Sequence, residues 1–400
     1  MLEEDFTHIT SSPLINWQLF ANANILITGA NGFLPAYMAK TLLKLNTTLL
    51  KHAPCRVLAL VRNYKHAKEV FAPYLDSACS DKSPILRRGL AHYRLDKSLR
   101  PHLESGDFSS TILESQSGEK STECEKSTQP LESIRQDLVL ITHDVSEPLS
   151  LPYPIHYIIH AASPASPRFY KDAPLSVIYP NVLGTINMLN LARTNPVRSI
   201  LYFSSGEVYG EFAGEIDENA YGYVDPTSLR SCYAESKRMG ENLCIAYGSE
   251  YGLPIKIARP FHTYGPGMKL DDGRVFADFV RSVVMGQDIV LTSSGEAKRS
   301  FLYLSDATLA YFLILTKGVN NEAYNVANEQ GIISIKKLAQ IIVGLFPEKG
   351  LRVRFEPPNE SYMPSPILSC DVKTAKLNAL GFSPKVSIEE GFSKTIRSYL

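Results

Sequence analysis

Six short apolar runs, separated by segments with helical periodicity, constrain the fold of this chain more than any other feature. The runs are NILIT (24–28), RVLALV (56–61), DLVLITH (137–143), YIIHAA (157–162), SILYFSS (199–205) and IKIARP (255–260). Each is rich in Ile, Leu and Val without polar alternation, which is typical of strands covered on both faces. Strands that alternate with helices predict an α/β fold with a doubly wound parallel sheet, and such sheets bind ligands at the carboxyl ends of their strands.

The pattern also predicts how the chain is divided. Residues 1–22 form a preamble, residues 23–261 a dinucleotide-binding Rossmann domain, and residues 262–400 mainly a smaller C-terminal substrate-binding domain interleaved with the core. Within the first domain, the segment of about 104–136 is polar, rich in Ser and Glu and almost without aromatic residues. Such a composition predicts a mobile surface insertion.

Charge and cysteine usage exclude several classes of protein. Lys plus Arg and Asp plus Glu number 41 each in the 400 residues, so no net charge favours binding to nucleic acid or to an anionic membrane. The six cysteines show no C-x-x-C spacing, and His156 and His160 lie in a strand-like run without a nearby carboxylate, which disfavours a metal site. With an acidic start and no apolar run of membrane-spanning length, a cytoplasmic protein is expected.

A glycine turn follows the first predicted strand, in TGANGFLPAYMAK. Gly29 and Gly32 allow backbone N–H groups, about those of Phe33 and Leu34, to approach a pyrophosphate at a helix N-terminus. Pro35 stands where a third glycine is usual, but it falls in the first helical turn, where proline is tolerated. Taken alone, this motif is also compatible with an ordinary strand-to-helix turn.

The residues after the second and third strands leave the choice of dinucleotide open. Where an acidic residue usually binds the ribose hydroxyls, the chain has Arg62, which suits a 2′-phosphate or stacking on adenine. Asp144 follows the third strand and is a candidate for the adenine edge, with an exposed loop aspartate as the alternative. NAD is expected, and NADP is not excluded.

Tyr233 and Lys237 are four residues apart in CYAESKRMGENL and therefore share one face of a helix. A lysine cation beside a tyrosine favours the phenolate, which can then take a hydroxyl proton. The spacing alone is weak evidence, because Tyr64 and Lys68 repeat it. Ser205 ends a strand 28 residues before Tyr233 and can bind the same hydroxyl, so the three residues together are far more specific.

Several segments complete a known pattern: TGANGF, HAASPASPRFY, NVLGTINMLNLA, SSGEVYG, YAESK and ARPFHTYGPGMKLDDGRV. With them the chain resembles the extended short-chain dehydrogenase/reductase superfamily, in its nucleotide-sugar epimerase/dehydratase branch, and within that branch it looks most like UDP-glucuronate decarboxylases. The resemblance runs from residue 24 to about 395 and is densest from 157 to 304.

The resemblance implies an enzyme in which a bound NAD takes a hydride from C4 of a nucleotide-linked sugar while Tyr233 accepts the hydroxyl proton. Ser205, Glu207, Tyr233 and Lys237 would be catalytic, and Asn181 would have the structural role of the family's helix asparagine. The implied cofactor-binding residues are Gly29, Gly32, Phe33, Leu34, Arg62, Asp144, Val145, Ala161, Ala162, Tyr233, Lys237 and Pro260. The implied substrate-binding residues are Ser163, Arg168, His262, Arg274 and Arg299. By the same resemblance, helices near 175–194 and 233–250 would pair in a homodimer.

Three departures leave the reaction open. Gly206 occupies a position where decarboxylases have serine, His262 one where the family has asparagine, and Arg168 one where decarboxylases have proline. A 4,6-dehydratase needs an acid beside Glu207, and Gly206 cannot supply it. Decarboxylation is the specific expectation, epimerisation the alternative and dehydration the third. A catalytically silent nucleotide-sugar-binding protein is the alternative from a different class.

Overall fold

The computed structural model describes residues 2–75, 137–212, 214–357 and 371–400, and the predicted insertion of about 104–136 lies outside these ranges. Helices cover α1 (Glu3–Thr10), α2 (Phe33–Asn46), α3 (Tyr64–Phe71), α5 (Arg168–Asp172), α6 (Pro174–Arg193), α7 (Cys232–Tyr251), α8 (Val275–Val284), α9 (Leu304–Lys317), α10 (Ile335–Gly344), α11 (Ala375–Ala379) and α12 (Ile388–Arg397). Short 3-10 turns include η1 (Trp17–Phe20), η4 (Gly206–Tyr209) and η5 (Leu229–Ser231).

A seven-stranded parallel sheet forms the centre of the fold, in the order β11-β7-β5-β4-β1-β2-β3. Its strands are β1 (Asn24–Thr28), β2 (Arg56–Val61), β3 (Leu138–Thr142), β4 (Tyr157–His160), β5 (Ser199–Phe203), β7 (Ile255–Pro260) and β11 (Glu322–Val326). The six predicted strands are therefore confirmed, together with the doubly wound parallel sheet. The seventh strand, EAYNV, was not predicted, because Glu322 and Asn325 interrupt its apolar pattern.

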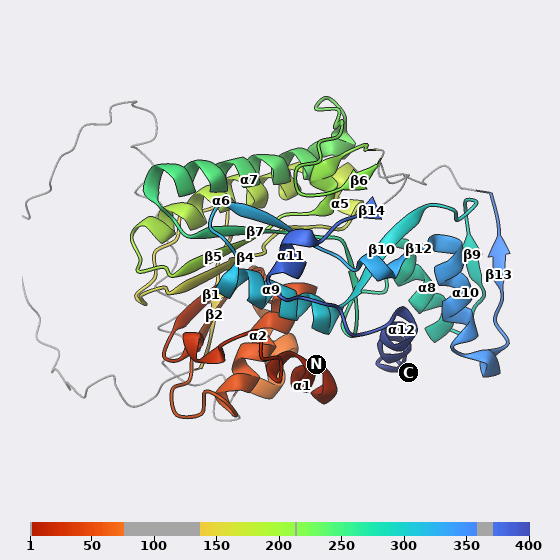
Figure 1. Cartoon of the computed structure of the whole chain (residues 1–400), viewed down its shortest axis with the longest axis horizontal. Helices are drawn as coiled ribbons and strands as arrows, with labels where there is room; N and C mark the ends of the chain where they lie inside the picture. Colours follow the sequence, from red (N-terminus) through yellow and green to blue (C-terminus); the bar gives the residue numbers. More distant parts are fainter. Residues whose placement is uncertain (1, 76–136, 213, 358–370) are drawn as a thin grey trace, which may run out of the picture. The chain divides into compact units, whose positions relative to one another are not determined.

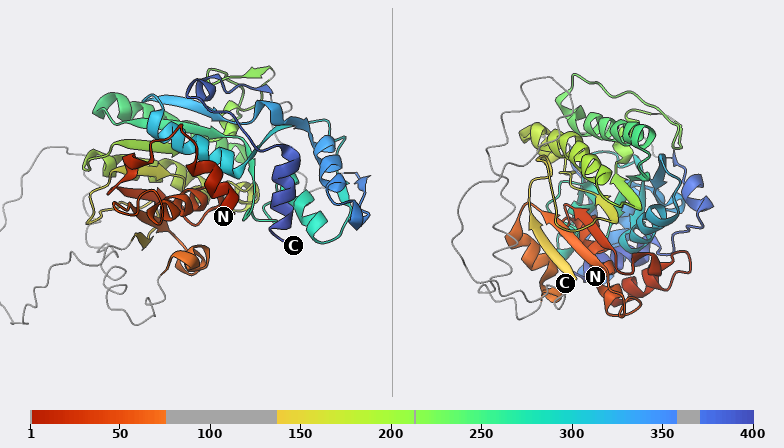
Figure 2. Two further views of the ribbon diagram at one scale, coloured as in Figure 1. Left: turned by 60° about the horizontal axis from the view of Figure 1, so that its bottom comes forward. Right: turned by 90° about the vertical axis from the view of Figure 1, so that its left-hand side faces the viewer.

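Helices cover both faces of this sheet (Figure 1). Side chains alternate between the faces along β1: Ile25 and Ile27 pack in one core with α1, α2 and α9, whereas Leu26 packs in a second core with α6 and α7. The right-hand view of Figure 2 shows α6 and α7 side by side on their face of the sheet. Both faces are thus buried, as continuous apolar strands require.

The C-terminal part has a core of its own. It contains α8, α10 and α12 around a three-stranded sheet of β12 (Ile332–Ser334), β10 (Lys298–Tyr303) and β8 (His262–Tyr264). Two small parallel pairs join β13 (Val353–Phe355) to β9 (Ile289–Leu291) and β14 (Asp371–Val372) to β6 (Glu215–Ile216). β11 is an edge strand of the seven-stranded sheet, and α9 packs in the core on one face of that sheet. Both come from the C-terminal part of the sequence, so the chain passes more than once between this sheet and the C-terminal core.

Candidate active site

The glycine turn after β1 has the geometry that a pyrophosphate needs. Gly29 has a φ of 63°, and a Cβ added to it would lie 2.9 Å from the Ala162 Cα, so only glycine fits there. The N–H of Gly32 donates to the Gly29 carbonyl at 2.8 Å, and Gly32 is the N-cap of α2. Pro35 is the third residue of α2, which confirms the prediction that it falls in the first helical turn.

The residues of this turn fit a dinucleotide. The N–H groups of Phe33 and Leu34 lie in the first turn of α2 and have no acceptor within the helix. The N-terminus of a helix carries about half a positive charge, which favours an anion at that point. A turn closed by glycines, with donors directed out of a helix start, is therefore a cradle in which a pyrophosphate can be bound.

The other predicted cofactor residues follow neighbouring strands at the same edge of the sheet. Arg62 is exposed directly after β2. Asp144 follows β3 and is exposed, and its Oδ1 accepts the Ser146 N–H at 2.9 Å. Val145 is buried, Ala161 and Ala162 follow β4, and Pro260 is the last residue of β7. The structure thus brings these predicted residues to the carboxyl ends of the strands, where their roles remain predictions.

Tyr233 and Lys237 are both buried in α7, with exposed fractions of 6% and 3%. The Lys237 ammonium donates to the Phe203 carbonyl at 2.6 Å and lies 5.8 Å from the centre of the Tyr233 ring. Ser205 is the N-cap of η4, and its hydroxyl lies close enough to Tyr233 to lower the Tyr233 pKa. The three predicted catalytic residues therefore lie together.

Burial dominates the proton affinities of this group. Burial, followed by the charge of Glu207, raises the pKa of Tyr233 to about 12, while Ser205, Arg274 and Arg230 oppose the rise. Burial also lowers the pKa of Lys237 to about 7, although Glu241 acts in the opposite direction. A lysine with this pKa is only partly charged at neutral pH. The predicted stabilisation of the Tyr233 phenolate by the Lys237 charge is therefore weak in the protein alone.

Glu207 is held by Arg230, a residue that the sequence analysis missed. The Arg230 guanidinium donates from Nη1 to Oε2 at 2.9 Å and from Nη2 to Oε1 at 3.2 Å. It also lies 4.8 Å from the centre of the Tyr170 ring, and that ring stacks on Tyr233 at 5.2 Å. Arg230 stands three residues before Tyr233, but no spacing rule links an arginine there to Glu207, so the sequence carried no signal for the pair.

The predicted substrate residues Arg274, Arg299 and His262 lie close enough for their charges to interact. Burial, then Arg299 and Arg274, lower the pKa of His262 to about 3, so the imidazole is neutral. His262 packs its ring against Phe276 and Phe301 at 6.0 and 5.7 Å, and its Nδ1 is buried without a hydrogen-bond partner among the described residues.

The three arginines differ in their exposure and in the groups that they contact. Arg274 pairs with Asp272, Nε to Oδ2 at 2.7 Å, and Arg299 is buried with its Nη1 donating to the Lys298 carbonyl at 2.7 Å. Arg168 is 57% exposed and lies 3.9 Å from Asp271, a weak surface contact.

Ser163 follows β4, and its Oγ is buried without a partner in the part of the chain that the structure describes. Buried polar groups are normally satisfied. Ser163 Oγ and His262 Nδ1 both lack a partner among the described residues, and both belong to residues that are predicted to bind substrate.

Position 206 has no room for a side chain. A Cβ added to Gly206 would lie 2.9 Å from the Phe261 ring, so any larger residue requires that ring to move. The serine that the resemblance leads us to expect at this position would therefore have to displace the Phe261 ring. The same crowding opposes the acid that a 4,6-dehydratase needs at this position.

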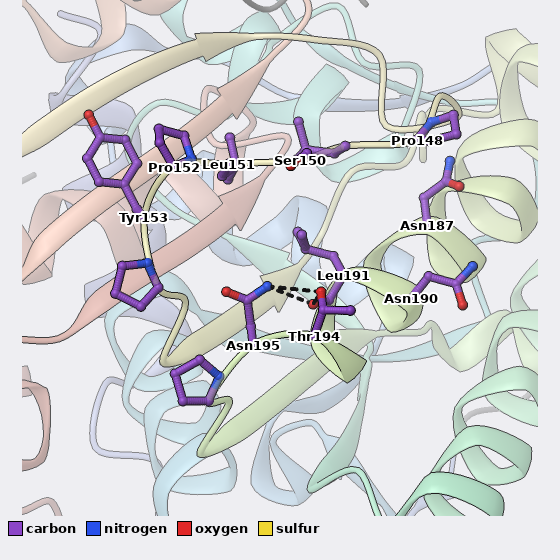
Figure 3. Close-up of a pocket in the computed structure, with 13 residues that line it drawn as sticks. Pro148, Ser150, Leu151, Pro152, Tyr153, Asn187, Asn190, Leu191, Thr194 and Asn195 are labelled. Carbon is purple, nitrogen blue, oxygen red and sulfur yellow. Dashed lines mark hydrogen bonds between the residues drawn. The ribbon is translucent and has the colours of Figure 1, made fainter. Parts of the chain in front are cut away.

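A pocket of about 660 Å³ lies elsewhere, beside the segments that lead into β4 and β5 (Figure 3). It is lined by Pro148–Pro154 and by residues of the C-terminal half of α6 and the loop after it, so it lies toward the amino ends of those strands. Its amides already have protein partners: Asn187 donates to the Val145 carbonyl, Asn190 accepts from Tyr247, and Asn195 donates to Leu191. The pocket offers little for recognition.

The described residues contain no cluster of three or more His, Cys, Asp or Glu side chains able to hold a metal ion. None of their helices combines the length and the apolar character needed to cross a bilayer.

The fold and the site together define a class: a Rossmann-type protein with a dinucleotide cradle and a Ser–Tyr–Lys group at the carboxyl edge of its sheet. The family model of the NAD dependent epimerase/dehydratase family matches residues 112–327, and the chain belongs to this family. It is an enzyme family that modifies nucleotide sugars, so the predicted family is confirmed.

Known proteins support this assignment. UDP-glucuronic acid decarboxylase 6 of Arabidopsis thaliana is 38% identical over 254 residues, which cover 63% of this chain and 71% of the relative. UDP-glucuronic acid decarboxylase 1 of Xenopus tropicalis is 35% identical over 271 residues, covering 66% of this chain and 61% of the relative. The solved UDP-glucuronic acid 4-epimerase of Bacillus cereus, in complex with UDP-glucuronic acid and NAD, has a TM-score of 0.65 at 18% identity over 94% of this chain and 98% of that chain.

Proposed function

We propose that this protein decarboxylates a nucleotide-linked hexuronic acid, of the UDP-glucuronic acid type, with NAD as a recycled cofactor. The observation that carries the proposal is the buried Ser205–Tyr233–Lys237 group beside Glu207, in a chain up to 38% identical to UDP-glucuronic acid decarboxylases. A silent binding protein has no chemical need for all of these side chains.

The protein's own residues suit the first step. NAD supplies a hydride acceptor for C4 of the sugar and returns the hydride later. Tyr233 takes the proton of the C4 hydroxyl, and Ser205, which lies close enough to lower the Tyr233 pKa, orients that hydroxyl. Lys237 lies against the Tyr233 ring and can hold a ribose hydroxyl in place of the Phe203 carbonyl.

The second step follows from the first. A C4 ketone makes a C6 carboxylate part of a β-keto acid, which loses carbon dioxide as the C5–C6 bond breaks and leaves its electron pair in an enolate. A proton from water then adds at C5. When the hydride returns to C4, Tyr233 gives its proton back to the C4 oxygen, so the product is a nucleotide-linked pentose. Because both Glu207 oxygens are engaged by Arg230, we propose that Glu207 orients the sugar rather than acting as a base.

Epimerisation at C4 is the second candidate. It needs the same Ser205, Tyr233 and Lys237 and no acid at position 206, and the crowding of Gly206 by Phe261 favours it over dehydration.

NAD is proposed over NADP on the family assignment, although the exposed Arg62 would also suit a 2′-phosphate. We further propose that residues 262–400 bind the nucleotide sugar mainly through Arg274, Arg299 and His262.

A homodimer is also proposed, through α6 and α7. Three apolar side chains spaced four residues apart on α6 are exposed, Leu175 at 55%, Tyr179 at 46% and Leu183 at 43%. Met239 at 49% and Ile245 at 40% are exposed on the neighbouring α7. Exposed apolar side chains that continue over two packed helices favour burial against a partner. A cytoplasmic location is proposed as well, supported by the buried thiols of Cys232 and Cys244.

One experiment separates these reactions. The protein is incubated with NAD and a panel of nucleotide sugars, including UDP-glucuronic acid, and the product masses are measured. Loss of carbon dioxide from the uronic acid is the expected result, whereas loss of water indicates dehydration, and unchanged mass with a new sugar configuration indicates epimerisation. Absence of any conversion or solvent-deuterium exchange would favour the silent binder.

A further inference from the structure

His160, the last residue of β4, is a buried imidazole with both ring nitrogens in hydrogen bonds. Its Nδ1 lies 2.8 Å from Thr28 Oγ1, and its Nε2 lies 3.2 Å from Thr185 Oγ1. Thr28 ends β1 directly before the glycine turn, and Thr185 belongs to α6. The imidazole therefore bridges the nucleotide turn and a helix on one face of the sheet.

The contacts of Thr28 fix the proton at one end of this bridge. Thr28 Oγ1 accepts the N–H groups of Ala161 and Ala162, each at 3.0 Å. A hydroxyl has two lone pairs and one proton, and both lone pairs are in use here. Thr28 must then donate its proton to His160, so Nδ1 is the acceptor and carries no proton.

The contacts of Thr185 lead to the same tautomer independently. The Thr185 hydroxyl donates to the Asn181 carbonyl at 2.6 Å, and a carbonyl oxygen can only accept. With its proton used, Thr185 can only accept from His160, so the Nε2 nitrogen carries the ring proton. A doubly protonated ring would direct its Nδ1–H at a Thr28 oxygen that has no lone pair left.

The chain of hydrogen bonds continues to the catalytic helix. Asn181 Nδ2 donates to Ser236 Oγ at 2.9 Å, and Ser236 Oγ donates to the Tyr233 carbonyl at 3.0 Å. All of these contacts are buried. The first turn of α7, which carries Tyr233, is thus joined through His160 to the strand end that precedes the Gly29 turn.

We propose that His160 is a positioning residue, which fixes the nucleotide turn and the catalytic helix in one register through a single neutral tautomer. Two groups from other elements face the ring: Lys237 on α7, and Tyr202 on β5 with its ring centre 5.8 Å away. Burial, then the charge of Lys237, lower the pKa of His160 to about 3, so the ring remains neutral over the physiological range. The inference rests on the proposed function only for its effect on turnover.

Two nearly isosteric variants test the two ends of the bridge separately. Thr185→Val breaks the link toward Tyr233 but leaves the Thr28 contacts, so kcat should fall roughly 10- to 100-fold, as for a misplaced catalytic group, with NAD affinity little changed. Thr28→Val leaves the Ala161 and Ala162 N–H groups unpaired beside the nucleotide turn, so NAD should bind more weakly. If Thr185→Val keeps full kcat, or weakens NAD binding as much as Thr28→Val does, the proposal is overturned.

A spectroscopic measurement tests the tautomer without any substrate. The protein is labelled with ¹⁵N-histidine, and the His160 signal is identified as the one that is lost in His160→Asn. We expect the ¹⁵N chemical shifts of a neutral ring protonated at Nε2. These shifts should not change between about pH 6 and 8, where an ordinary histidine titrates. A ring that titrates in this range, or one protonated at Nδ1, contradicts the proposal. Because this result does not depend on turnover, it stays informative even if the proposed reaction is wrong.

Discussion

Arg230 holds Glu207 through two parallel hydrogen bonds, at 2.9 Å and 3.2 Å, in a pair whose side chains are only 23% and 24% exposed. The same guanidinium lies over Tyr170, which in turn stacks on Tyr233. One cation thus orders both a candidate catalytic carboxylate and the ring beside the candidate catalytic tyrosine. Glu207 raises the pKa of Tyr233 and Arg230 lowers it, so the pair also limits the effect of the carboxylate charge.

Arg230→Met should lower kcat by roughly 10- to 100-fold, because Glu207 loses its orientation. The acid limb of the pH dependence of kcat should also move to higher pH, since an unpaired Glu207 raises the Tyr233 pKa further. Arg230→Lys keeps the charge but loses the two-point contact, so an intermediate effect is expected.

The double variant Glu207→Gln/Arg230→Met provides the control. Residues in direct contact usually show coupling of about 0.5 to 3 kcal/mol, and that range is expected here. Strictly additive effects on kcat would mean that the pair has no joint role.

Gly29→Ala should impair both stability and NAD binding, and Gly252→Ala supplies a matched control. The two glycines have similar φ values, 63° and 68°, but an added Cβ would contact Ala162 at 2.9 Å in the first case and nothing within 4 Å in the second. Left-handed strain alone costs about 1–2 kcal/mol per residue. We expect that loss in both variants, and an additional loss of NAD affinity in Gly29→Ala, measured by denaturation and calorimetry. Equal behaviour of the two variants would show that the contact with Ala162 is unimportant.

Gly206→Ser should destabilise the protein, although the resemblance described above leads us to expect serine at this position. Its Cβ would lie 2.9 Å from the Phe261 ring, and overpacking of this kind typically costs about 1–3 kcal/mol. Phe261→Leu should recover part of the loss, because it removes the contacting ring edge. Urea denaturation of the single and double variants tests this, and an unchanged midpoint for Gly206→Ser would show that Phe261 moves without cost.

His262 should make the protein sensitive to acid. Its pKa is about 3 in the folded protein against an ordinary value of 6.5, so the unfolded chain binds more protons between these values. Stability is therefore lost as the pH falls below 6.5, by about 2 kcal/mol at pH 5 for a single such group. His262→Asn should remove this part of the loss. Urea midpoints at pH 8 and pH 5 test the difference, and an identical loss in both proteins would assign the acid sensitivity to other groups.

The six apolar runs predicted the parallel sheet correctly because strands covered on both faces must be apolar throughout, which is visible in the sequence. The seventh strand was missed for the opposite reason. Asn325 is buried in β11, but its side-chain amide donates to the carbonyls of Ile216 and Lys373, and contacts with such distant residues leave no local pattern.

Local spacing was enough to predict the glycine turn, the start of α2 and the shared helix face of Tyr233 and Lys237, because backbone geometry and helical periodicity fix these over a few residues. Long-range packing accounts for three other relationships: Arg230 engages Glu207, Phe261 fills the space at Gly206, and His160 has one tautomer between Thr28 and Thr185. These relationships join different elements of the fold, and they depend on distances and burial that exist only once the layers have packed.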